Sequence, residues 1–387
     1  PVNGYGYNEE TKAMLQTSHG FVPWGDAHHP ELSQTDGVPD GRYIFINENN
    51  TPRVAKIDLK KFQTTEILEI PNSAGNHASP FVTQNTEYIS AATRFSVPIE
   101  GEKDVAIDSY AETFGGTLSF IKLQDDGSMK LDFQILVPGF DYDLSHSGKG
   151  PSHGWSFFTS YNSEEAHTLL EINASKNDKD FIAAVNWKKA AEYAAQGKGK
   201  MMKGEYLRNY VDPETHIATT EKNEEVHVLD PRELPGIIYF LPTPKSPHGV
   251  DVSPDGELIA AGGKLSTVIP VHSFSKMLDA IENEEFEGEV KGIPVLKYDA
   301  ILAGEVQDPG LGPLHTEFDG NGYAYTTAFI TSEIVKWSLE TFEVVDRIDT
   351  YYSPGHLMIP GGDTREPYGK YLIALNKIGR ASCRERV

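Results

Sequence analysis

The sequence has little of three features that would place it in familiar protein classes. It holds one cysteine, Cys383, in 387 residues, so disulfides, cysteine-type zinc sites and iron–sulfur clusters are excluded within it. It contains no run of about 18 apolar residues, so we expect no membrane-spanning helix. The first residues carry neither a basic nor an apolar segment, so we expect no signal peptide in this sequence.

Basic residues are also scarce. The chain has 34 Lys plus Arg against 57 Asp plus Glu, a net charge of −23. Such a surface repels phosphate backbones, so nucleic-acid binding is disfavoured, while a basic protein partner would be attracted. Hydrophobic residues at 39% and charged residues at 24% are typical of a globular protein. The length permits either two domains or one propeller-sized domain.

The last ten residues, 378–387, differ in character from the rest. They read Ile-Gly-Arg-Ala-Ser-Cys-Arg-Glu-Arg-Val after an acidic, aromatic-rich chain, and they resemble a translated sequencing adapter. We therefore expect residues 378–387 to be foreign and the fold to occupy residues 1–377. On this interpretation the natural chain continues beyond Lys377.

Strand signals dominate the chain. Short runs rich in β-branched and aromatic residues are bounded by Gly, Pro, Asn or Asp. They lie at residues 41–47, 53–59, 87–92, 116–123, 257–262, 322–329, 333–337 and 370–375. Helix is the minority and is expected over 186–195 and 275–281. The polar stretch 196–235 is expected to be an insertion rather than part of a blade.

A loose internal repeat links these strands to histidines. His248 and His315 each precede a turn containing Asp-Gly and then a strand, and His29, His77 and His356 stand in the same phase. Intervals of 48, 67 and 41 residues separate His29 from His77, His248 from His315, and His315 from His356. They lie near or above the roughly 40–50 residues of a propeller blade. A turn–strand–turn–strand unit at that period predicts a β-propeller.

Residues at one phase of a propeller repeat converge on its axis. Because His28 adjoins His29, six histidines then aim at one point: His28, His29, His77, His248, His315 and His356. Imidazole suits copper, zinc, iron or nickel, and six imidazoles exceed the need of one four-coordinate ion, so the pattern indicates a polynuclear metal centre. The alternative for any single histidine is a surface or hydrogen-bonded role. Seven others fit no such pattern: His19, His146, His153, His167, His216, His227 and His272.

The segments around these histidines carry a family resemblance. They are Asp26–Gly37, Gly75–Ser79, Ser246–Gly249, Gly312–His315 and Pro354–His356. Together they resemble nitrous oxide reductase, as do Gly150–Phe158 and Asn177–Ile182. The resemblance runs from about residue 5 to Lys377, and it rests on the ensemble, since no single motif would suffice.

This resemblance implies an all-β, seven-bladed β-propeller with an incomplete last blade and short helical insertions. The hub would hold a sulfide-bridged four-copper cluster that reduces nitrous oxide to dinitrogen and water, the last step of denitrification. The family uses seven histidine ligands, six of which fall on the six histidines above. The seventh would lie beyond Lys377, with a cupredoxin domain that carries a binuclear copper site for incoming electrons. We therefore expect this copper-dependent oxidoreductase chain to be inactive alone.

Other roles follow from the same resemblance. Lys377 aligns with a lysine near the cluster edge. A cation there could donate a hydrogen bond to the substrate oxygen and help to deliver a proton. Glu31 replaces a histidine that some members have, but that position is not a cluster ligand. His153 stands in a similar Ser-His-Gly context and is left outside the metal shell. The family also implies a periplasmic homodimer that accepts electrons from a basic c-type cytochrome or a cupredoxin.

A calcium site is implied too. Tyr161, Glu164, Ile172 and Asp178 match the family's calcium positions, with backbone carbonyls expected from Tyr161 and Ile172. Ligation by oxygen alone, from the carboxylates of Glu164 and Asp178, suits calcium. Ser246 stands where the family often has Asn, so that ligand stays open. The alternative is a solvated acidic loop.

Two readings from other classes remain. One is a non-enzymatic propeller scaffold whose acidic surface recruits a basic protein. The other is a mononuclear calcium or zinc hydrolase on a propeller, although such sites favour carboxylates where this hub has histidines. Fold alone decides nothing between them, because propellers host many functions. Metal analysis separates them.

Overall fold

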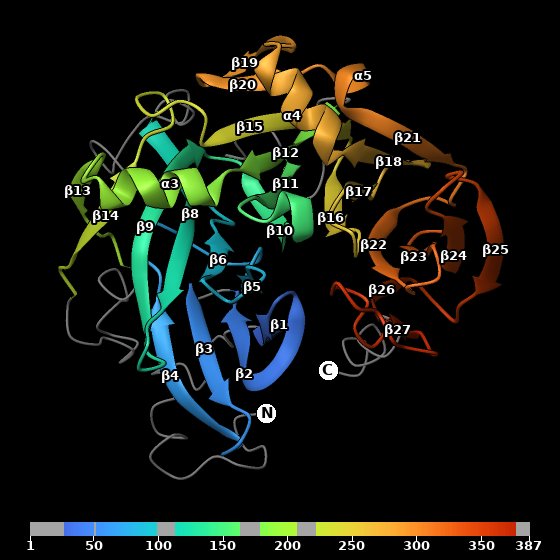
Figure 1. The fold of residues 1–387 in the computed structure, drawn as a ribbon, viewed down its shortest axis with the longest axis horizontal. Helices are drawn as coiled ribbons and strands as arrows, with labels where there is room; N and C mark the ends of the chain where they lie inside the picture. The colour runs from blue at the N-terminus through green and yellow to red at the C-terminus, as the bar shows by residue number, and fades with distance from the viewer. Residues whose placement is uncertain (1–26, 50–51, 99–112, 163–178, 207–221, 377–387) are drawn as a thin grey trace, which may run out of the picture.

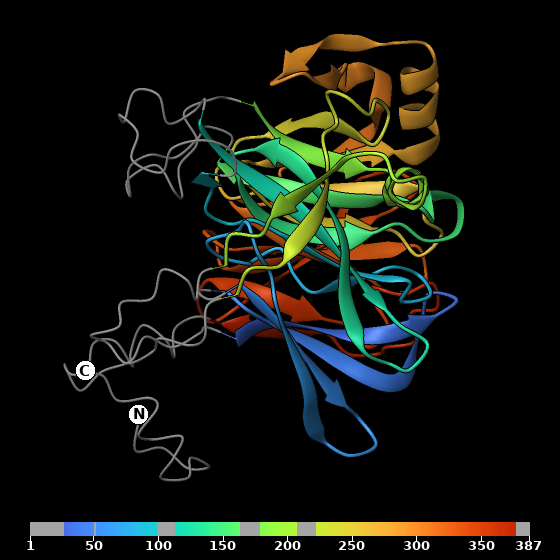
Figure 2. The ribbon, with the colours of Figure 1, turned by 90° about the vertical axis from the view of Figure 1, so that its left-hand side faces the viewer.

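The protein is an all-β propeller with few helices. The computed structural model describes residues 27–49, 52–98, 113–162, 179–206 and 222–376. In this part of the chain, five sheets of four or more strands stand as blades around a central axis, with a sixth, two-stranded sheet beside them (Figure 1). The perpendicular view shows the blades as successive layers (Figure 2).

The first two blades come mainly from the first 140 residues. The first has the order β1 (Ala27–Thr35), β2 (Val38–Glu48), β3 (Arg53–Asp58) and β4 (Gln63–Glu69). The second joins β5 (Phe81–Val82), β6 (Tyr88–Ala92), β7 (Val97–Pro98), β8 (Phe114–Leu123), β9 (Met129–Pro138), β13 (Lys200–Lys203) and β14 (Glu225–Leu229).

The remaining sheets follow in chain order around the axis. The third joins β10 (Asp141–Ser147), β11 (Ser156–Asn162), β12 (Lys179–Val185), β15 (Ile238–Pro244), β20 (Ile293–Leu296) and β19 (Phe286–Val290). The fourth joins β16 (Pro247–Val252), β17 (Leu258–Gly263), β18 (Val268–Ser273) and β21 (Leu302–Gln307). The fifth joins β22 (Pro313–Phe318), β23 (Tyr323–Ala328), β24 (Glu333–Ser338) and β25 (Val344–Asp349). β26 (Pro354–Met358) pairs with β27 (Ile373–Asn376).

The predicted seven blades are wrong for this structure, which has five in the described ranges. Part of the reason lies in the insertions. β13 and β14 fall within 196–235, which was expected to lie outside the blades, yet β14 pairs in parallel with β9. The β19–β20 hairpin likewise joins the third sheet through β15. Inserted strands therefore widen existing blades, which a count of strand signals cannot foresee.

The helices agree with the expectation from sequence. α3 (Trp187–Ala195) begins after Asn186, whose side chain accepts a hydrogen bond from the Lys189 amide, and α4 (Phe274–Glu282) begins after Ser273. A short α5 (Tyr298–Ile301) and the 3-10 turn η2 (Gly150–Ser152) complete the set in the described residues. α4 and α5 lie together at the outer rim (Figure 1). No helix of these ranges is long and apolar enough to cross a bilayer.

The hydrophobic core is divided among the interfaces between neighbouring blades. Phe45 of the first blade packs in one cluster with Ile121 of the second. Phe120 of the second shares another with Phe240 of the third. Trp337 of the fifth blade is fully buried in a cluster with Val271 of the fourth. Each blade is thus stabilised chiefly by burying its faces against its neighbours.

The inner strands approach one another closely around the axis. Contacts run from β1 to β5, β10, β16, β22 and β26 in succession. Between β16 and β22 the approach is so close that a Cβ atom at Gly249 would overlap the Leu314 carbonyl. The loop after β26 returns to the first blade, where the Arg365 amide donates to the Gly37 carbonyl at 3.0 Å. The hub is therefore a tightly packed region and not an open pore.

Candidate metal centre

Five inner strands change register at the position where a hub side chain lies. The irregularities fall at Ala27/Pro30 in β1, Tyr142/Ser145 in β10, Pro247/Val250 in β16, Pro313/Thr316 in β22 and Pro354/Leu357 in β26. A β-bulge bends its strand and re-aims a side chain. The residues within these intervals include His28, His29, Asp143, His248, His315 and His356. The same local device therefore recurs from blade to blade, while His77 comes from the loop before β5.

The six imidazoles form a closed circuit at the hub. On one side, ring centroids lie 4.5 Å apart for His28–His29 and for His29–His77. His77 lies 6.2 Å from His248, which lies 4.7 Å from His315. His315 lies 4.7 Å from His356, which lies 5.2 Å from both His28 and His29. The structure thus brings together side chains that are up to 328 positions apart in the sequence.

Asp143 holds two of these rings. Its Oδ1 lies 2.6 Å from Nδ1 of His77, and its Oδ2 contacts Nδ1 of His248. Burial by itself raises the pKa of the Asp143 carboxyl, but the attraction of His248 and His77 and their hydrogen bonds hold the pKa well below its usual range. The carboxylate therefore stays ionised and fixes both Nδ1 atoms as donors, which turns Nε2 toward the centre.

Backbone and amide groups hold the other rings. Nδ1 of His29 lies 2.8 Å from the His77 carbonyl. Asn47 Oδ1 accepts from the amides of His28 and His29, at 3.0 and 2.7 Å, and Asn47 Nδ2 donates to the Asn76 carbonyl. One buried asparagine thus ties the first bulge to the loop that carries His77.

The electrostatics favour neutral imidazoles. Burial, and then the neighbouring rings, lower the pKa of His29 well below 6.5, and the same causes lower the pKa of His315. A neutral imidazole offers a lone pair, which is the form that binds a metal ion. The hub is therefore rich in lone pairs at neutral pH.

The nitrogen atoms at the hub fit a metal site. Nε2 of His29 is buried and has no hydrogen-bond partner among the described residues. Nε2 of His248 lies 3.0 Å from Nε2 of His315, where two lone pairs would face each other unless a proton or a cation lies between them. His28, His29 and His77 have ligand atoms within 4.8 Å of one another. Six imidazole nitrogen donors suit copper, zinc, iron or nickel.

The sequence is similar to those of known proteins. A family model for the nitrous oxide reductase propeller repeat matches residues 347–383. The nitrous-oxide reductase of Stutzerimonas stutzeri is 29% identical over 98% of the chain, and those of Ralstonia nicotianae and Cupriavidus necator are 31% identical over 97% and 96%. The chain is a relative of the nitrous-oxide reductases. It spans about half the length of these relatives, 56% in each case.

Several residues singled out through the resemblance to nitrous-oxide reductase lie outside the described part. These are Lys377 and, of the calcium set, Glu164, Ile172 and Asp178. The backbone of Tyr161 lies in β11, one residue before the described range 113–162 ends. Residues 378–387, expected to be foreign, are also outside it, although the family match includes the first six of them.

The histidines set aside from the reductase pattern have other partners. His153 contacts Glu87 at 2.8 Å and packs edge-on against Trp187, both in the body of the fold. His272 is fully buried beside Tyr298. His146 lies deeper along the same inner strand as Asp143, among other ionisable groups.

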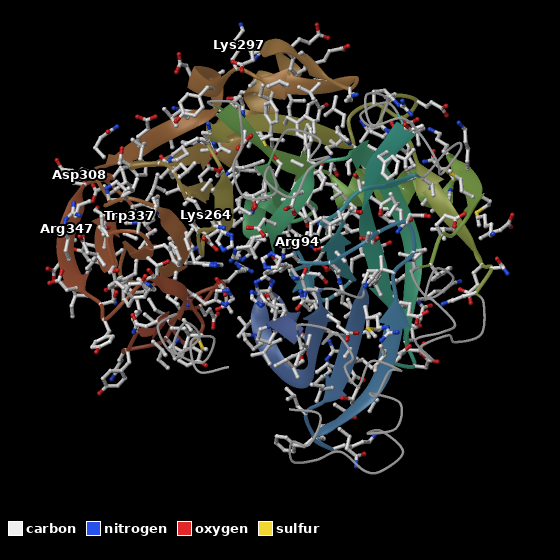
Figure 3. All side chains as sticks on the ribbon, turned by 180° about the vertical axis from the view of Figure 1, so that it is seen from behind. Arg94, Lys264, Lys297, Asp308, Trp337 and Arg347 are labelled. Carbon is white, nitrogen blue, oxygen red and sulfur yellow. The ribbon has the colours of Figure 1, made fainter. Side chains whose placement is uncertain are left out.

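Sequence reasoning missed Asp143 and Asn47. Asp143 stands five positions after Pro138 in the run Gly-Phe-Asp-Tyr-Asp-Leu-Ser, with no histidine in its repeat phase, so a search for histidines passes over it. The position of Asp143 in its blade could have identified it. β10 is the first strand of a blade, and Asp143 lies at the bulge where other blades carry histidine. Arg94 and Lys264, near the centre in Figure 3, also went unnoticed, and their attraction opposes the burial that raises the pKa of Asp141.

Proposed function

We propose that this propeller binds a copper cluster at its hub and serves the reduction of nitrous oxide to dinitrogen and water. The observation that carries the proposal is the closed circuit of six imidazoles, which includes the unpartnered Nε2 of His29 and the facing Nε2 atoms of His248 and His315. The names of the relatives support the same reaction. When bound, a copper cluster bridged by sulfide would supply the electrons that the N–O bond cleavage needs.

The ligands in this proposal are His28, His29, His77, His248, His315 and His356. The work of the surrounding residues is to keep these rings neutral and oriented. Asp143 fixes the rings of His77 and His248, and Asn47 fixes the strand that carries His28 and His29. Lys377 is proposed to hold and deliver a proton at the oxygen of the substrate.

A structural calcium ion belongs to the same proposal. Its ligands would be the carboxylates of Glu164 and Asp178 with the carbonyls of Tyr161 and Ile172, since four oxygen atoms suit a hard cation. The electron-accepting binuclear copper site is proposed to lie in the part of the relatives that this chain does not span. The acidic surface, with a net charge of −23, favours a basic c-type cytochrome or cupredoxin as donor. We further propose a periplasmic homodimer.

Metal analysis tests the proposal. The chain would be reconstituted with copper and sulfide in the absence of oxygen, separated from free metal, and analysed for copper, calcium, zinc and sulfide. About four copper atoms per chain, lost together in His248→Ala with His315→Ala, would support it. His153→Ala and His227→Ala provide the matched control, because these rings contact Glu87 and the Lys198 carbonyl instead of the hub.

Other outcomes would favour the alternatives. Calcium or zinc alone, at one equivalent, would point to a mononuclear hydrolase, and no bound metal would point to a scaffold. For the reaction itself, the natural full-length protein would be loaded with copper and assayed for nitrous oxide consumption with a reduced viologen. Copper binding without any turnover would refute the reductase assignment while leaving the metal site intact.

A further inference from the structure

A second layer of buried ionisable groups follows the histidines along the inner strands. Glu31 comes two residues after His29, Asp251 three after His248, Glu317 two after His315, and His146 three after Asp143. Lys149 and Asp363 join them from the loops after β10 and β26. Because an extended strand rises about 3.3 Å per residue, this layer lies roughly 7–10 Å along the axis from the imidazoles. None of these groups has a part in the proposed copper site.

Lys149 is the centre of this layer. It is 3% exposed, and its Nζ donates to the carbonyls of Asp363 at 2.6 Å and of Val252 at 3.1 Å. Its third neighbour is Nε2 of His146, at 3.2 Å. All three contacts bind the amine to rigid parts of the hub.

The hydrogen bonds of His146 bear on the protonation state of Lys149. The Val252 amide donates to Nδ1 of His146 at 3.2 Å, so Nδ1 must carry the lone pair. A neutral imidazole then carries its proton on Nε2, which can donate to Lys149 Nζ or to the backbone of Asp363. An ammonium group has no lone pair to accept that bond, whereas a neutral amine has one lone pair and two hydrogens for the two carbonyls. The geometry thus accommodates the neutral amine, and it accommodates the ammonium when the Nε2–H of His146 donates to the backbone of Asp363 instead.

The surrounding charges keep the ammonium form within reach. Carboxyl groups face Lys149 from each element packed against it: Glu31 of β1, Asp251 of β16, Glu317 of β22 and Asp363 of the loop after β26. Burial lowers the pKa of Lys149 and these carboxyls oppose the shift, which leaves the pKa at about 8. Burial, and then the charge of Lys149, lowers the pKa of His146, so that ring stays neutral. Both the ammonium and the amine form of Lys149 are therefore accessible near neutral pH.

A small cavity connects Lys149 with polar side chains nearer the surface. Its volume is about 10 Å³, and its lining includes Glu31, Gln34, Gln84, His146 and Lys149. That is room for about one water molecule, and the site is polar enough to hold it. One water molecule in this cavity would lie beside Lys149 and the other polar side chains of the lining.

We propose that Lys149 is a proton-exchange site of this second layer, which takes up a proton from the medium and supplies it to the reaction at the hub. The supply to the hub rests on the proposed function. Reduction of nitrous oxide consumes two protons and two electrons and yields dinitrogen and water, with the electrons coming from a reduced donor protein. For one of the protons, an N–H bond of the Lys149 ammonium breaks, an O–H bond of the product water finally forms, and the neutral amine regains its proton through the cavity.

The first experiment tests proton exchange in the chain itself, without copper. The chain would be labelled with 15N at the lysine side chains and titrated by NMR between pH 6 and 11. One Nζ resonance should titrate near pH 8, where ordinary lysines titrate near 10.4, and it should vanish in Lys149→Met. Lys56→Met, which removes another buried lysine, one paired with Glu66, should keep it. If every lysine titrates above about 10, the proposal is overturned.

The second experiment tests supply to the hub in the natural full-length protein loaded with copper. The wild-type rate of nitrous oxide reduction should fall as pH rises through 8, because the ammonium is the donor. Lys149→Met and Lys149→Arg should lose about 100-fold in rate at pH 7, with copper content and cluster absorption unchanged, because one cannot hold a proton and the other cannot release one. Lys56→Met should retain the wild-type rate and profile.

The outcomes separate the two proposals. A wild-type protein that binds copper but consumes no nitrous oxide refutes the reductase function, while the NMR titration still decides on Lys149. If the protein is active and its Lys149→Met variant keeps the wild-type rate and pH profile, the proposed proton supply from Lys149 is overturned. Should Lys149→Met fail to fold, as judged by circular dichroism, Lys149→Gln takes its place. A wild-type rate of nitrous oxide reduction in Lys149→Gln counts equally against the proposed proton supply.

Discussion

Asp143 Oδ1 lies 2.6 Å from Nδ1 of His77, so a buried carboxylate fixes the orientation of a hub imidazole. The second oxygen of the same carboxylate contacts Nδ1 of His248, the next ring of the circuit. One acidic side chain therefore couples two histidines that are 171 positions apart in the sequence. The hub depends on this residue although it carries no imidazole.

Replacing Asp143 should weaken metal binding without removing a ligand. Asp143→Asn keeps the shape of the side chain but removes the charge that orients the rings, so copper affinity should fall about 10–100-fold. Titration with copper against a competing chelator measures this change. Asp132→Asn is the matched control. Asp132 accepts a hydrogen bond from Tyr88 in the second blade, and Tyr88 is not a hub residue. Equal affinities of wild type and Asp143→Asn would contradict the expectation.

Acid should destabilise the fold through His272. Burial lowers the pKa of His272 from 6.5 to about 4, so in the range between these values the unfolded chain binds a proton that the folded chain does not. Stability should therefore fall as pH drops from 6.5 toward 4, by about 3 kcal/mol in total if the whole shift is realised. Urea unfolding at a series of pH values should show a shallower slope for His272→Leu.

A methyl group between two inner strands should disturb the hub. In Gly249→Ala, the added Cβ would overlap the Leu314 carbonyl, and both atoms belong to rigid strands. We expect a loss of about 1–3 kcal/mol from overpacking, together with weaker copper binding because His248 is the adjacent residue. Gly41→Ala is the control for an added methyl group that meets no neighbour. Nothing lies within 4 Å of the Cβ position of Gly41, although its φ of 70° is positive, unlike that of Gly249, and adds backbone strain. If Gly249→Ala melts at the same temperature as the strained Gly41→Ala, or at a higher one, the expected cost of the close approach of β16 and β22 is contradicted.

The contact between the fourth and fifth blades should depend on one indole. Trp337 is fully buried, and its Nε1 donates to Thr326 Oγ1 at 2.9 Å (labelled in Figure 3). Trp337→Ala should cost about 3–5 kcal/mol, since it removes a large buried side chain and leaves a cavity. Tyr371→Ala, at a position 82% exposed, should change stability by less than about 0.5 kcal/mol. Thermal or chemical unfolding of the two variants provides the measurement.

Local pattern determined much about this protein. The runs around Phe45, Phe120 and Trp337 predict strands because β-branched and aromatic residues fit a pleated, buried surface, and all three lie in strands. The repeat phase of His29, His77, His248, His315 and His356 predicts convergence, since equivalent positions of successive blades face one axis. The helices after Asn186 and Ser273 follow from their caps.

The tertiary structure alone decided the number of blades, the register of the hub and the charges beneath it. The number of blades depends on which sheet accepts an inserted strand, and β14 found its partner in β9, about 90 residues earlier in the chain. The bulges that aim His248 and His315 are register shifts between paired strands and leave no signature in either strand alone. Asp143 and Lys149 acquire their roles from neighbours contributed by other blades. Strand pairing and side-chain burial depend on segments that come together in space. The pattern of residues along the sequence therefore does not determine them by itself.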